Sequence, residues 1–426
     1  MTDLFRLSAI QAIEQLAAGT ISAEALVRSC LDRIAAREPA VQAWVCNDAE
    51  AALSQARAID RSKTRGALAG IPFAVKDVID TCELPTQCNS PIYRDHRPRA
   101  DASCVALARA AGGIVLGKTV TTEFASRVPG PTRNPHNPAH TPGGSSSGAA
   151  AAVADCMVPL AFGTQTGGSV IRPAAYCGVV GYKPSFGTIN GAGLKHLSES
   201  LDTIGVMART VADCALLVNV TSARAIPDFE APRAPRIGVC HTVRRNDASN
   251  ETHALIERTA TTLSGHGAQV RAFELPAQFD HLYDDQPVIS GFEAARAFGH
   301  ERRVHPDLLS AHLRNHIDTF AVLPRARYGD AMRRARDSRR MFSQIMGDAG
   351  LDVLLTPSAP GEAPQGLGHT GEALFNRIWT LLGVPCVTLP VGRGPLGLPL
   401  GVQLVADYDE DERLLACAHW VLRAAT

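Results

Sequence analysis

The chain has 426 residues with 42 basic and 42 acidic side chains, so its formal net charge at pH 7 is zero. This length can hold one large α/β domain or two to three ordinary domains, and a hydrophobic share of 45% is typical of a soluble globular protein. The balanced charge argues against a dedicated nucleic-acid-binding protein, which usually carries a basic excess.

Cysteine usage and hydropathy indicate the compartment. Eleven cysteines are scattered singly, with no CxxC pair, which favours reduced thiols over a disulfide framework or a zinc site. The first residues show no charged segment followed by an apolar run, so no secretory signal is expected. The longest nearly apolar stretch, 149–162, is interrupted by Asp155 and Pro159 and is too short to span a bilayer. We therefore expect a cytoplasmic protein without membrane contact.

The predicted elements of the first part alternate between helices and strands. Ser22 is a candidate N-cap for a helix that runs to about Arg37 and ends before Pro39. A second helix is expected at 102–111, and strands are expected at 41–46, 70–77 and 113–117. This alternation indicates βαβ units and an α/β fold with a mixed, mostly parallel sheet covered by helices.

The middle of the chain begins with a Gly/Pro/Asn-rich stretch at 129–148, where little regular structure is expected. Loops this long inside a compact domain are uncommon and often functional. An alanine-rich helix, a strand at 158–162 and a glycine-containing turn at 163–169 follow, and a boundary or hinge is expected at 227–235.

Beyond the hinge, strands are expected at 236–241, 351–356 and 386–391. Between them lies an Arg-rich helix, 325–340, with seven Arg and two Asp. Its pattern fits either a face that binds RNA or phosphate or a solvated helix face with charged pairs. The neutral charge of the whole chain favours the solvated face.

Two Gly/Ser turns carry the strongest chemical signal, GGSSSG at 143–148 and TQTGGS at 164–169. Each precedes an expected helix, whose first N–H groups and dipole favour an anion or oxyanion. The P-loop pattern and the Gly-x-Ser-x-Gly elbow are both absent, and His305 follows His300 one residue too late for a zincin. A serine without histidine needs another base. Lys76 ends an apolar strand, where burial would lower its pKa, but taken alone this position is better explained by a strand-end charge that reaches water.

Taken together, these segments resemble the amidase signature family of Ser-Ser-Lys hydrolases. The resemblance extends from GIPFAVKD at 70–77, through the long core at 143–175, to GLPLGVQ at 397–403. Ser145 lies twenty-four positions before Ser169, which matches the family's spacing between its bridging serine and its nucleophile. The resemblance implies one amidase domain over 1–426. Its expected parts are a signature core at about 70–205, a more variable helical part at about 227–350 and a C-terminal return to the sheet at about 351–426.

The resemblance also implies the roles of the site residues. Ser169 would be the nucleophile and Lys76 the base, and Ser145, preceded by a cis peptide bond in the family, would relay the proton. The oxyanion hole would consist of the backbone N–H groups of Thr166, Gly167, Gly168 and Ser169. Neither a metal nor a cofactor is expected.

This chain departs from the common family pattern at two positions. Gln165 replaces an acidic residue four positions before the nucleophile, and the usual arginine moves from the second to the third position after it, to Arg172. On a helix the third position lies on nearly the same face as Ser169, so Arg172 would point toward the site and suit a substrate carboxylate. A structural role for Arg172, capping carbonyls or pairing with an acid, is the alternative. The candidate substrate-binding residues are Arg172, Gln165, Gly144, Ser146, Arg127 and Arg377.

Within the family, the segments 124–127, 134–137, 163–178 and 376–381 resemble the malonamidase group. We therefore expect an amidase that converts a small, carboxylate-bearing, malonamate-like amide into acid and ammonia through an acyl-enzyme on Ser169. The alternatives are the glutaminase component of a tRNA-dependent amidotransferase, a hydrolase of small carbamoyl or urea-type amides, and an inactive scaffold. The expected partner is a small-molecule amide, with no nucleic acid and no membrane; a homodimer is left open.

Overall fold

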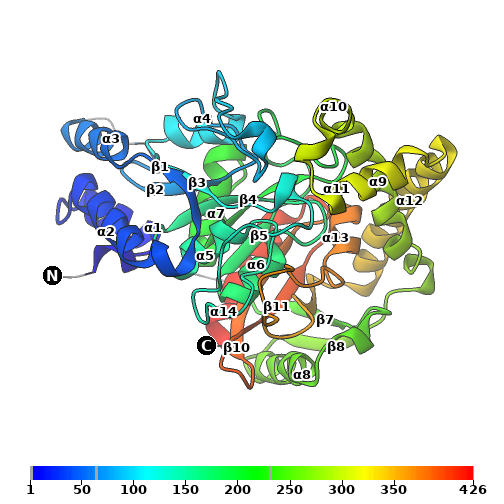
Figure 1. Cartoon of the computed structure of the whole chain (residues 1–426). Coiled ribbons are helices and arrows are strands. Elements are labelled where there is room, and N and C mark those ends of the chain that lie inside the picture. The colour runs from blue at the N-terminus through cyan, green and yellow to red at the C-terminus, as the bar shows by residue number, and fades with distance from the viewer. Residues whose placement is uncertain (1–2, 63–65, 230–232, 426) are drawn as a thin grey trace.

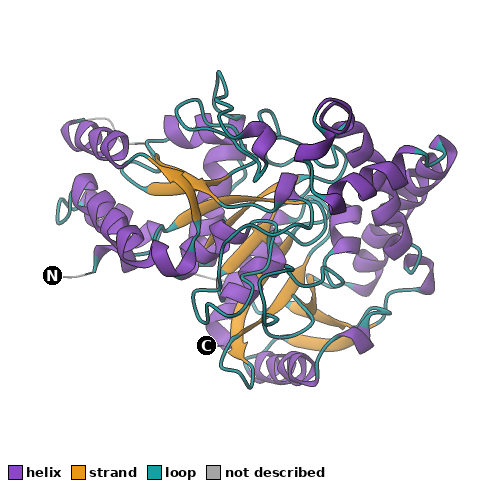
Figure 2. Cartoon of the chain, in the orientation of Figure 1, coloured by secondary structure: helices purple, strands orange, loops and turns teal. Residues whose placement is uncertain are grey.

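One sheet joins distant parts of the chain. The computed structural model describes residues 3–62, 66–229 and 233–425, and their eleven strands form a sheet in the order β1-β3-β2-β4-β6-β5-β10-β11-β9-β7-β8. The strands are β1 (Trp44–Asn47), β2 (Pro72–Lys76), β3 (Ile114–Thr119), β4 (Leu160–Gln165), β5 (Val180–Lys183), β6 (Thr203–Ala208), β7 (Arg236–Cys240), β8 (Gln269–Phe273), β9 (Val353–Pro357), β10 (Cys386–Arg393) and β11 (Pro399–Val405). Figure 2 shows these strands running through the molecule between helices.

The sheet is mixed, as expected from the sequence. Parallel pairs form two groups, β3–β2–β4 and β9–β7–β8. The pairs that lead from β4 through β6, β5, β10 and β11 to β9 are antiparallel, and so is the pair of β1 with β3. The expected α/β fold is thus confirmed, with its parallel pairing confined to the two flanks.

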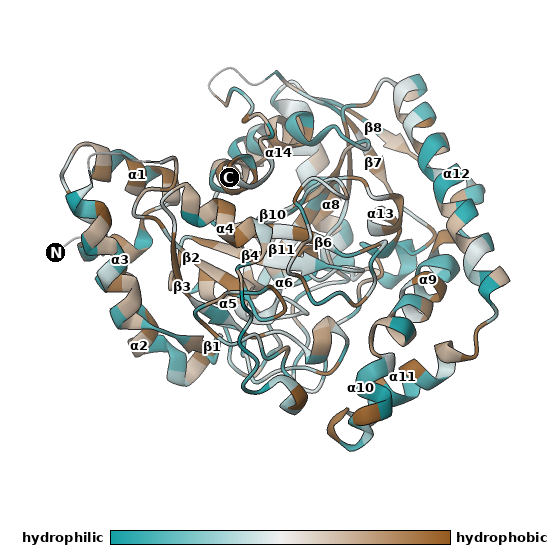
Figure 3. Ribbon diagram, turned by 90° about the horizontal axis from the view of Figure 1, so that it is seen from above, coloured by the Kyte–Doolittle hydropathy of each residue, from teal (hydrophilic) through white to brown (hydrophobic). Residues whose placement is uncertain are grey.

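Helices cover both faces of the sheet. They are α1 (Ala9–Ala17), α2 (Ala23–Val41), α3 (Ala49–Arg61), α4 (Ser103–Ala110), α5 (Ser147–Ala154), α6 (Ile171–Cys177), α7 (Val211–Ser222), α8 (Asn250–Gly265), α9 (Leu282–Ala297), α10 (Gly299–Val304), α11 (Ala311–Ala321), α12 (Arg325–Ala349), α13 (Arg377–Leu382) and α14 (Asp411–Ala425). Figure 3 shows α8 and α14 on one side of the sheet and α5 and α6 on the other. None of the helices in the described ranges is long and apolar enough to cross a membrane.

Helices α9 to α12 gather at the end of the molecule opposite α1 to α3 (Figure 1). Helices α9 and α12 pack with α13 and neighbouring strands around a second hydrophobic cluster, which includes Phe279, Phe342 and Trp379. The Arg-rich helix α12 buries Ala331, Phe342 and other residues of one face and exposes its charged side chains. This amphipathic arrangement supports the solvated-face interpretation of the Arg-rich segment. Of the hinge expected at 227–235, residues 230–232 lie outside the described residues.

The expected end of α2 before Pro39 is wrong, because the helix continues to Val41. Pro39 lies in the last turn, where the missing N–H removes a single backbone hydrogen bond. The carboxylate of Glu38 accepts hydrogen bonds from the backbone N–H groups of Ala43 and Trp44, each at 2.9 Å. These two bonds hold the chain directly after the helix and stabilise the longer form.

Small residues allow α5 to lie directly against the sheet beside the site. Its residues Ser147–Val153 are all buried. A Cβ atom on Gly148 would lie 2.1 Å from the carbonyl oxygen of Ala43 and 2.5 Å from the backbone nitrogen of Val120. Only glycine therefore permits this close contact between backbones. The contact fixes the position of the GGSSSG turn, which ends at Gly148, against the sheet.

Candidate active site

Three separate segments bring Lys76, Ser145 and Ser169 together. Lys76 ends β2, and Ser169 lies in the turn after β4, which is the parallel neighbour of β2. The carboxyl ends of parallel strands meet at one edge of the sheet, where α/β proteins usually bind ligands. Ser145 lies in the turn that precedes α5, and the peptide bond between Gly144 and Ser145 is cis.

Lys76 is fully buried and placed for proton transfer. Its Nζ lies 2.7 Å from the Oγ of Ser145 and 2.7 Å from the Oγ1 of Thr164. Burial lowers the pKa of Lys76 to about 7, an effect that the carboxylate of Asp202 opposes and the guanidinium of Arg172 reinforces. A large fraction of this lysine is therefore neutral near pH 7 and able to accept a proton.

Hydrogen bonds with side chains of other segments hold the turn at Thr166–Ser169 in position. The hydroxyl of Thr166 donates to Asp202 at 2.5 Å, and the carbonyls of Thr166 and Gly167 accept hydrogen bonds from Gln286 and Thr380. These bonds leave the inner side of the turn free to meet a substrate.

The amide groups of this turn are available as donors. Within the described part of the chain, the backbone N–H groups of Gly167, Gly168 and Ser169 donate no hydrogen bond. Free N–H groups beside a serine hydroxyl suit a developing oxyanion, which would lie within hydrogen-bonding distance of them. The geometry is therefore compatible with the oxyanion hole expected from the sequence.

Ser146 and Gly144 support the site rather than line its cavity. Ser146 is fully buried, and its Oγ lies 3.2 Å from both the backbone N and the carbonyl O of Thr164. Its backbone N–H donates to the carbonyl of Ser169 at 3.2 Å, which ties the two turns together. The carbonyl of Gly144 accepts a hydrogen bond from Arg172. These observed contacts support the turns, and the substrate contact expected of the two residues stays a prediction.

Arg172 lies in the first turn of α6 with only 7% of its surface exposed. Its Nη2 donates to the carbonyl of Gly144 at 2.6 Å and to the Oγ1 of Thr370 at 3.2 Å. Its Nε is buried without a partner in the described structure. Burial lowers the pKa of Arg172 to about 10, so the group remains charged at neutral pH.

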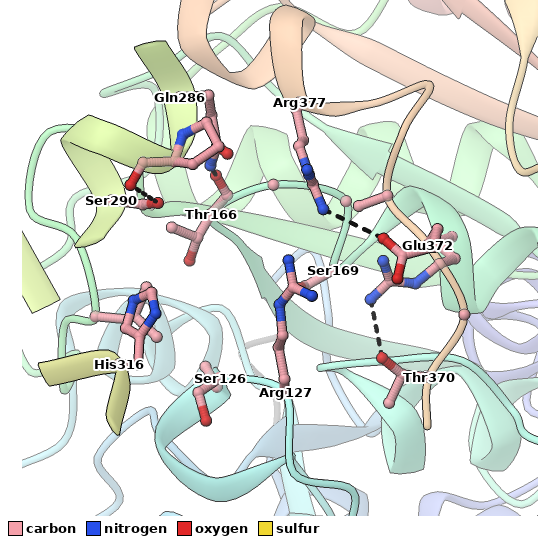
Figure 4. Close-up of a pocket in the computed structure, with 18 of the residues that line it drawn as sticks. Ser126, Arg127, Thr166, Ser169, Gln286, Ser290, His316, Thr370, Glu372 and Arg377 are labelled. Carbon is pink, nitrogen blue, oxygen red and sulfur yellow. Dashed lines mark hydrogen bonds and ion pairs between the residues drawn. The ribbon is translucent and has the colours of Figure 1, made fainter. Parts of the chain in front are cut away.

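Ser169 and Arg172 both line a cavity of about 220 Å³. Arg127 and Arg377 extend toward Ser169 from opposite sides, and Arg377 pairs with Glu372 at 3.3 Å (Figure 4). The volume suits a small molecule. Among the charged side chains around it, Arg127, Arg172 and Arg377 outnumber the single acid, Glu372.

A family model described as Amidase matches residues 25–415. The chain belongs to the amidase family. Its relative in Roseiflexus castenholzii, named as one of the subunits of glutamyl-tRNA(Gln) amidotransferase, is 34% identical over 97% of this chain and 95% of its own length. The peptide amidase from Stenotrophomonas maltophilia is 29% identical, with a TM-score of 0.87 and coverage of 99% of this chain and 97% of that one. A structure of 6-aminohexanoate cyclic dimer hydrolase is 26% identical, with the same TM-score and coverage of 100% and 98%.

These likenesses establish that this amidase is an amidohydrolase with the amidase signature fold. They do not bear on the individual site residues, which rest on the geometry described above. The curated relatives found are amidotransferase subunits and do not support the expected resemblance to malonamidase specifically.

In this amidase Gln165 is a structural residue, which corrects its expected contact with substrate. Its Oε1 accepts hydrogen bonds from the backbone N–H groups of Val170 and Ile171, at 2.9 and 3.1 Å. Its Nε2 donates to the Oγ1 of Thr380 at 3.0 Å. The side chain is fully buried and absent from the cavity lining, so it caps the start of α6 below the reactive turn.

Sequence reasoning missed several residues of the site, among them Thr164, Asp202, Thr370 and Glu372. Thr164 could have been found, because alternation along β4 places its side chain on the same face as that of Phe162 and opposite that of Gln165. The other three lie 33 to 203 positions beyond Ser169, and no spacing in the sequence connects them to it.

Proposed function

We propose that this amidase hydrolyses a small amide that carries a carboxylate, such as malonamate, to the acid and ammonia. The observation that supports this substrate class is Arg172, a buried guanidinium in the same small cavity as Ser169. A buried cation is costly unless an anion meets it, and a carboxylate matches the planar fork of an arginine. The Nη1 of Arg172 makes no hydrogen bond in the described structure and is available for such a contact.

The proposed reaction begins with proton transfer. Neutral Lys76 accepts a proton from Ser145, Ser145 accepts one from Ser169, and the oxygen of Ser169 attacks the amide carbonyl. The free N–H groups of the turn stabilise the oxyanion, a contribution worth ~10²–10³ in rate for a single donor. The proton returns through Ser145 to the leaving nitrogen, ammonia departs, and water hydrolyses the acyl-enzyme by the same relay. This scheme uses neither a metal nor an organic cofactor.

Arg172 also stabilises the turn itself, and the test must separate its two roles. Through Nη2 it holds the carbonyl of Gly144, the residue before Ser145. Loss of Arg172 could therefore slow every substrate by disturbing Ser145, or slow only anionic substrates by removing the cation. Malonamate and 3-methylbutanamide separate the two effects, because an isopropyl group replaces a carboxylate of nearly the same shape.

We expect Arg172→Ala to lower kcat/KM for malonamate by about 10²–10³, because a lost buried charge contact costs a few kcal/mol. Activity on 3-methylbutanamide should fall far less, and Arg172→Lys should restore only part of the malonamate activity. Thr370→Val is a matched control, because it removes the other hydrogen-bond partner of the Arg172 Nη2 and leaves the positive charge of Arg172 in place. Equal losses on both amides would show that Arg172 acts only on the turn.

A second candidate function is the glutaminase component of a tRNA-dependent amidotransferase. It is favoured by the 34% identity with the Roseiflexus amidotransferase relative over nearly the whole chain. The two functions differ in what they require. Ammonia release from malonamate by the purified chain alone supports the independent hydrolase, whereas glutamine hydrolysis that requires tRNA and partner proteins supports the amidotransferase. Urea-type amides in the same screen test the carbamoyl alternative.

A further inference from the structure

We propose that the cavity also binds a second carboxylate, carried by the leaving amine of the substrate, between Arg127 and Arg377. This inference rests on the proposed function and extends its substrate class to secondary amides, of which N-malonylglycine is the simplest. The acyl-side carboxylate would meet Arg172, and the amine-side carboxylate would meet the other two arginines.

The charges around the cavity call for more than one anion. Apart from histidines, the ionisable side chains that line it are Arg127, Arg172, Arg377 and Glu372, which together carry two net positive charges. A substrate with one carboxylate, like malonamate, would leave one of these charges uncompensated. A substrate with two carboxylates balances them, which favours such a substrate in a partly desolvated site.

The backbone that leads to Arg127 is held in place, and the side chain of Arg127 has no anionic partner. It follows a short 3₁₀ turn, Glu123–Ala125, and the hydroxyl of Thr122 donates to the carbonyl of Ser126 at 2.9 Å across this turn. The side chain of Arg127 is exposed, and within the described residues it makes no hydrogen bond or ion pair. Figure 4 shows it extending toward Ser169. A cation presented in this way from a fixed turn is suited to a ligand.

Arg377 faces Arg127 across the cavity and has a replaceable partner. It begins α13, and its side chain is 17% exposed. Its partner Glu372 is 56% exposed, and the two meet at 3.3 Å. Ion pairs this open to water contribute little stability, so a substrate carboxylate can take the place of Glu372. Burial lowers the pKa of Arg377, and the charge of Arg127 lowers it further, so the two cations interact.

The position of Ser145 assigns the second carboxylate to the leaving amine. In the proposed relay Ser145 returns the proton to the leaving nitrogen, so that nitrogen faces Ser145. The segment that leads to Arg127 is hydrogen-bonded to Ser145. The backbone N–H of Thr122 in this segment donates to the carbonyl of Ser145 at 3.3 Å. A substituent on the nitrogen therefore extends along the wall that carries Arg127.

The reaction on such a substrate is an ordinary hydrolysis. Ser169 forms an ester bond to the malonyl carbonyl, the C–N bond breaks, and the nitrogen takes the relayed proton and leaves as glycine. Water then cleaves the ester, so one N-malonylglycine and one water give one malonate and one glycine.

The test compares N-malonylglycine with N-isobutyl malonamate, in which an isopropyl group replaces the amine-side carboxylate. We expect the wild-type enzyme to prefer N-malonylglycine by about tenfold in kcat/KM, the contribution of one partly exposed charge contact. Arg127→Gln and Arg377→Gln should each remove most of this preference. Glu372→Gln should increase it by lowering KM for N-malonylglycine, a change that a merely structural role would not produce. Arg336→Gln, an exposed residue of α12 outside the cavity, is the matched control and should leave the preference unchanged.

Equal rates on the two secondary amides in the wild type would overturn the inference, and so would an unchanged preference in both arginine variants. Hydrolysis of malonamate without glycine release from N-malonylglycine would overturn it as well, while leaving the proposed function intact. Failure on malonamate and on both secondary amides would instead refute the proposed function itself.

Discussion

The buried Lys76 should determine how activity depends on pH. An ordinary lysine has a pKa near 10.5, at which only about one molecule in 3,000 is neutral at pH 7. With the pKa lowered to about 7, half of the molecules are neutral at that pH. The protonated form cannot accept a proton, so activity must fall as the pH falls through this value. We expect kcat/KM to drop about tenfold per pH unit below pH 7 and to level off above it.

The measurement is the initial rate of ammonia release from malonamate between pH 5 and 9 at constant ionic strength. The substrate carboxylate does not titrate in this range, so the acid limb reports on the enzyme. Lys76→Ala is the control, and it should lower kcat/KM by about 10²–10⁴ and abolish the limb. A wild-type profile that is flat, or that rises only above about pH 9, would refute the proposal that burial prepares Lys76 as the base.

Two further predictions concern the residues around this lysine. Ser169→Ala should abolish turnover while leaving the thermal unfolding temperature nearly unchanged, because only one oxygen is lost; a residual rate above a few per cent, with contaminating amidases excluded, would contradict its assignment as the nucleophile. Asp202→Asn should shift the acid limb to lower pH, because the carboxylate of Asp202 raises the pKa of Lys76; a limb that shifts to higher pH, in a variant that still folds, would show that Asp202 acts otherwise.

Sequence patterns predicted the segments of the site better than their contacts. The apolar run before Lys76 identified β2, and the glycine-rich composition at 129–148 identified a loop that has no regular element before α5 begins at Ser147. Both signals are local, because burial of a strand and the conformational needs of glycine are visible within a few residues. The helix that passes Pro39 was missed because its end is stabilised by the side chain of Glu38, which a general rule for proline does not consider.

The errors within the site have a different cause. Gln165 was expected to touch substrate, and it stands where the family pattern has an acidic residue four positions before the nucleophile. Its Nε2 instead donates to Thr380, 215 positions away, and a partner at that distance leaves no trace in a single sequence. For Arg172, helical spacing correctly placed the side chain in the cavity of Ser169, but its hydrogen bond to Thr370 could be seen only in the folded chain.

The wall of the cavity that carries the nucleophile and the wall opposite it come from different parts of the chain. The proton-relay residues all lie between Lys76 and Ser169, on the sheet and its turns, whereas the opposite wall comes from 286–316 and 369–377. The relay residues, Arg127 and Arg172 thus share one part of the chain, whereas the wall that includes Arg377 is carried by separate stretches. Replacing 286–316 and 369–377 with the matching segments of a relative would change this wall of the pocket and leave the nucleophile unaltered. The helices α9 to α11 and the loop before α13 are therefore the segments to change in order to direct such an enzyme toward other amides.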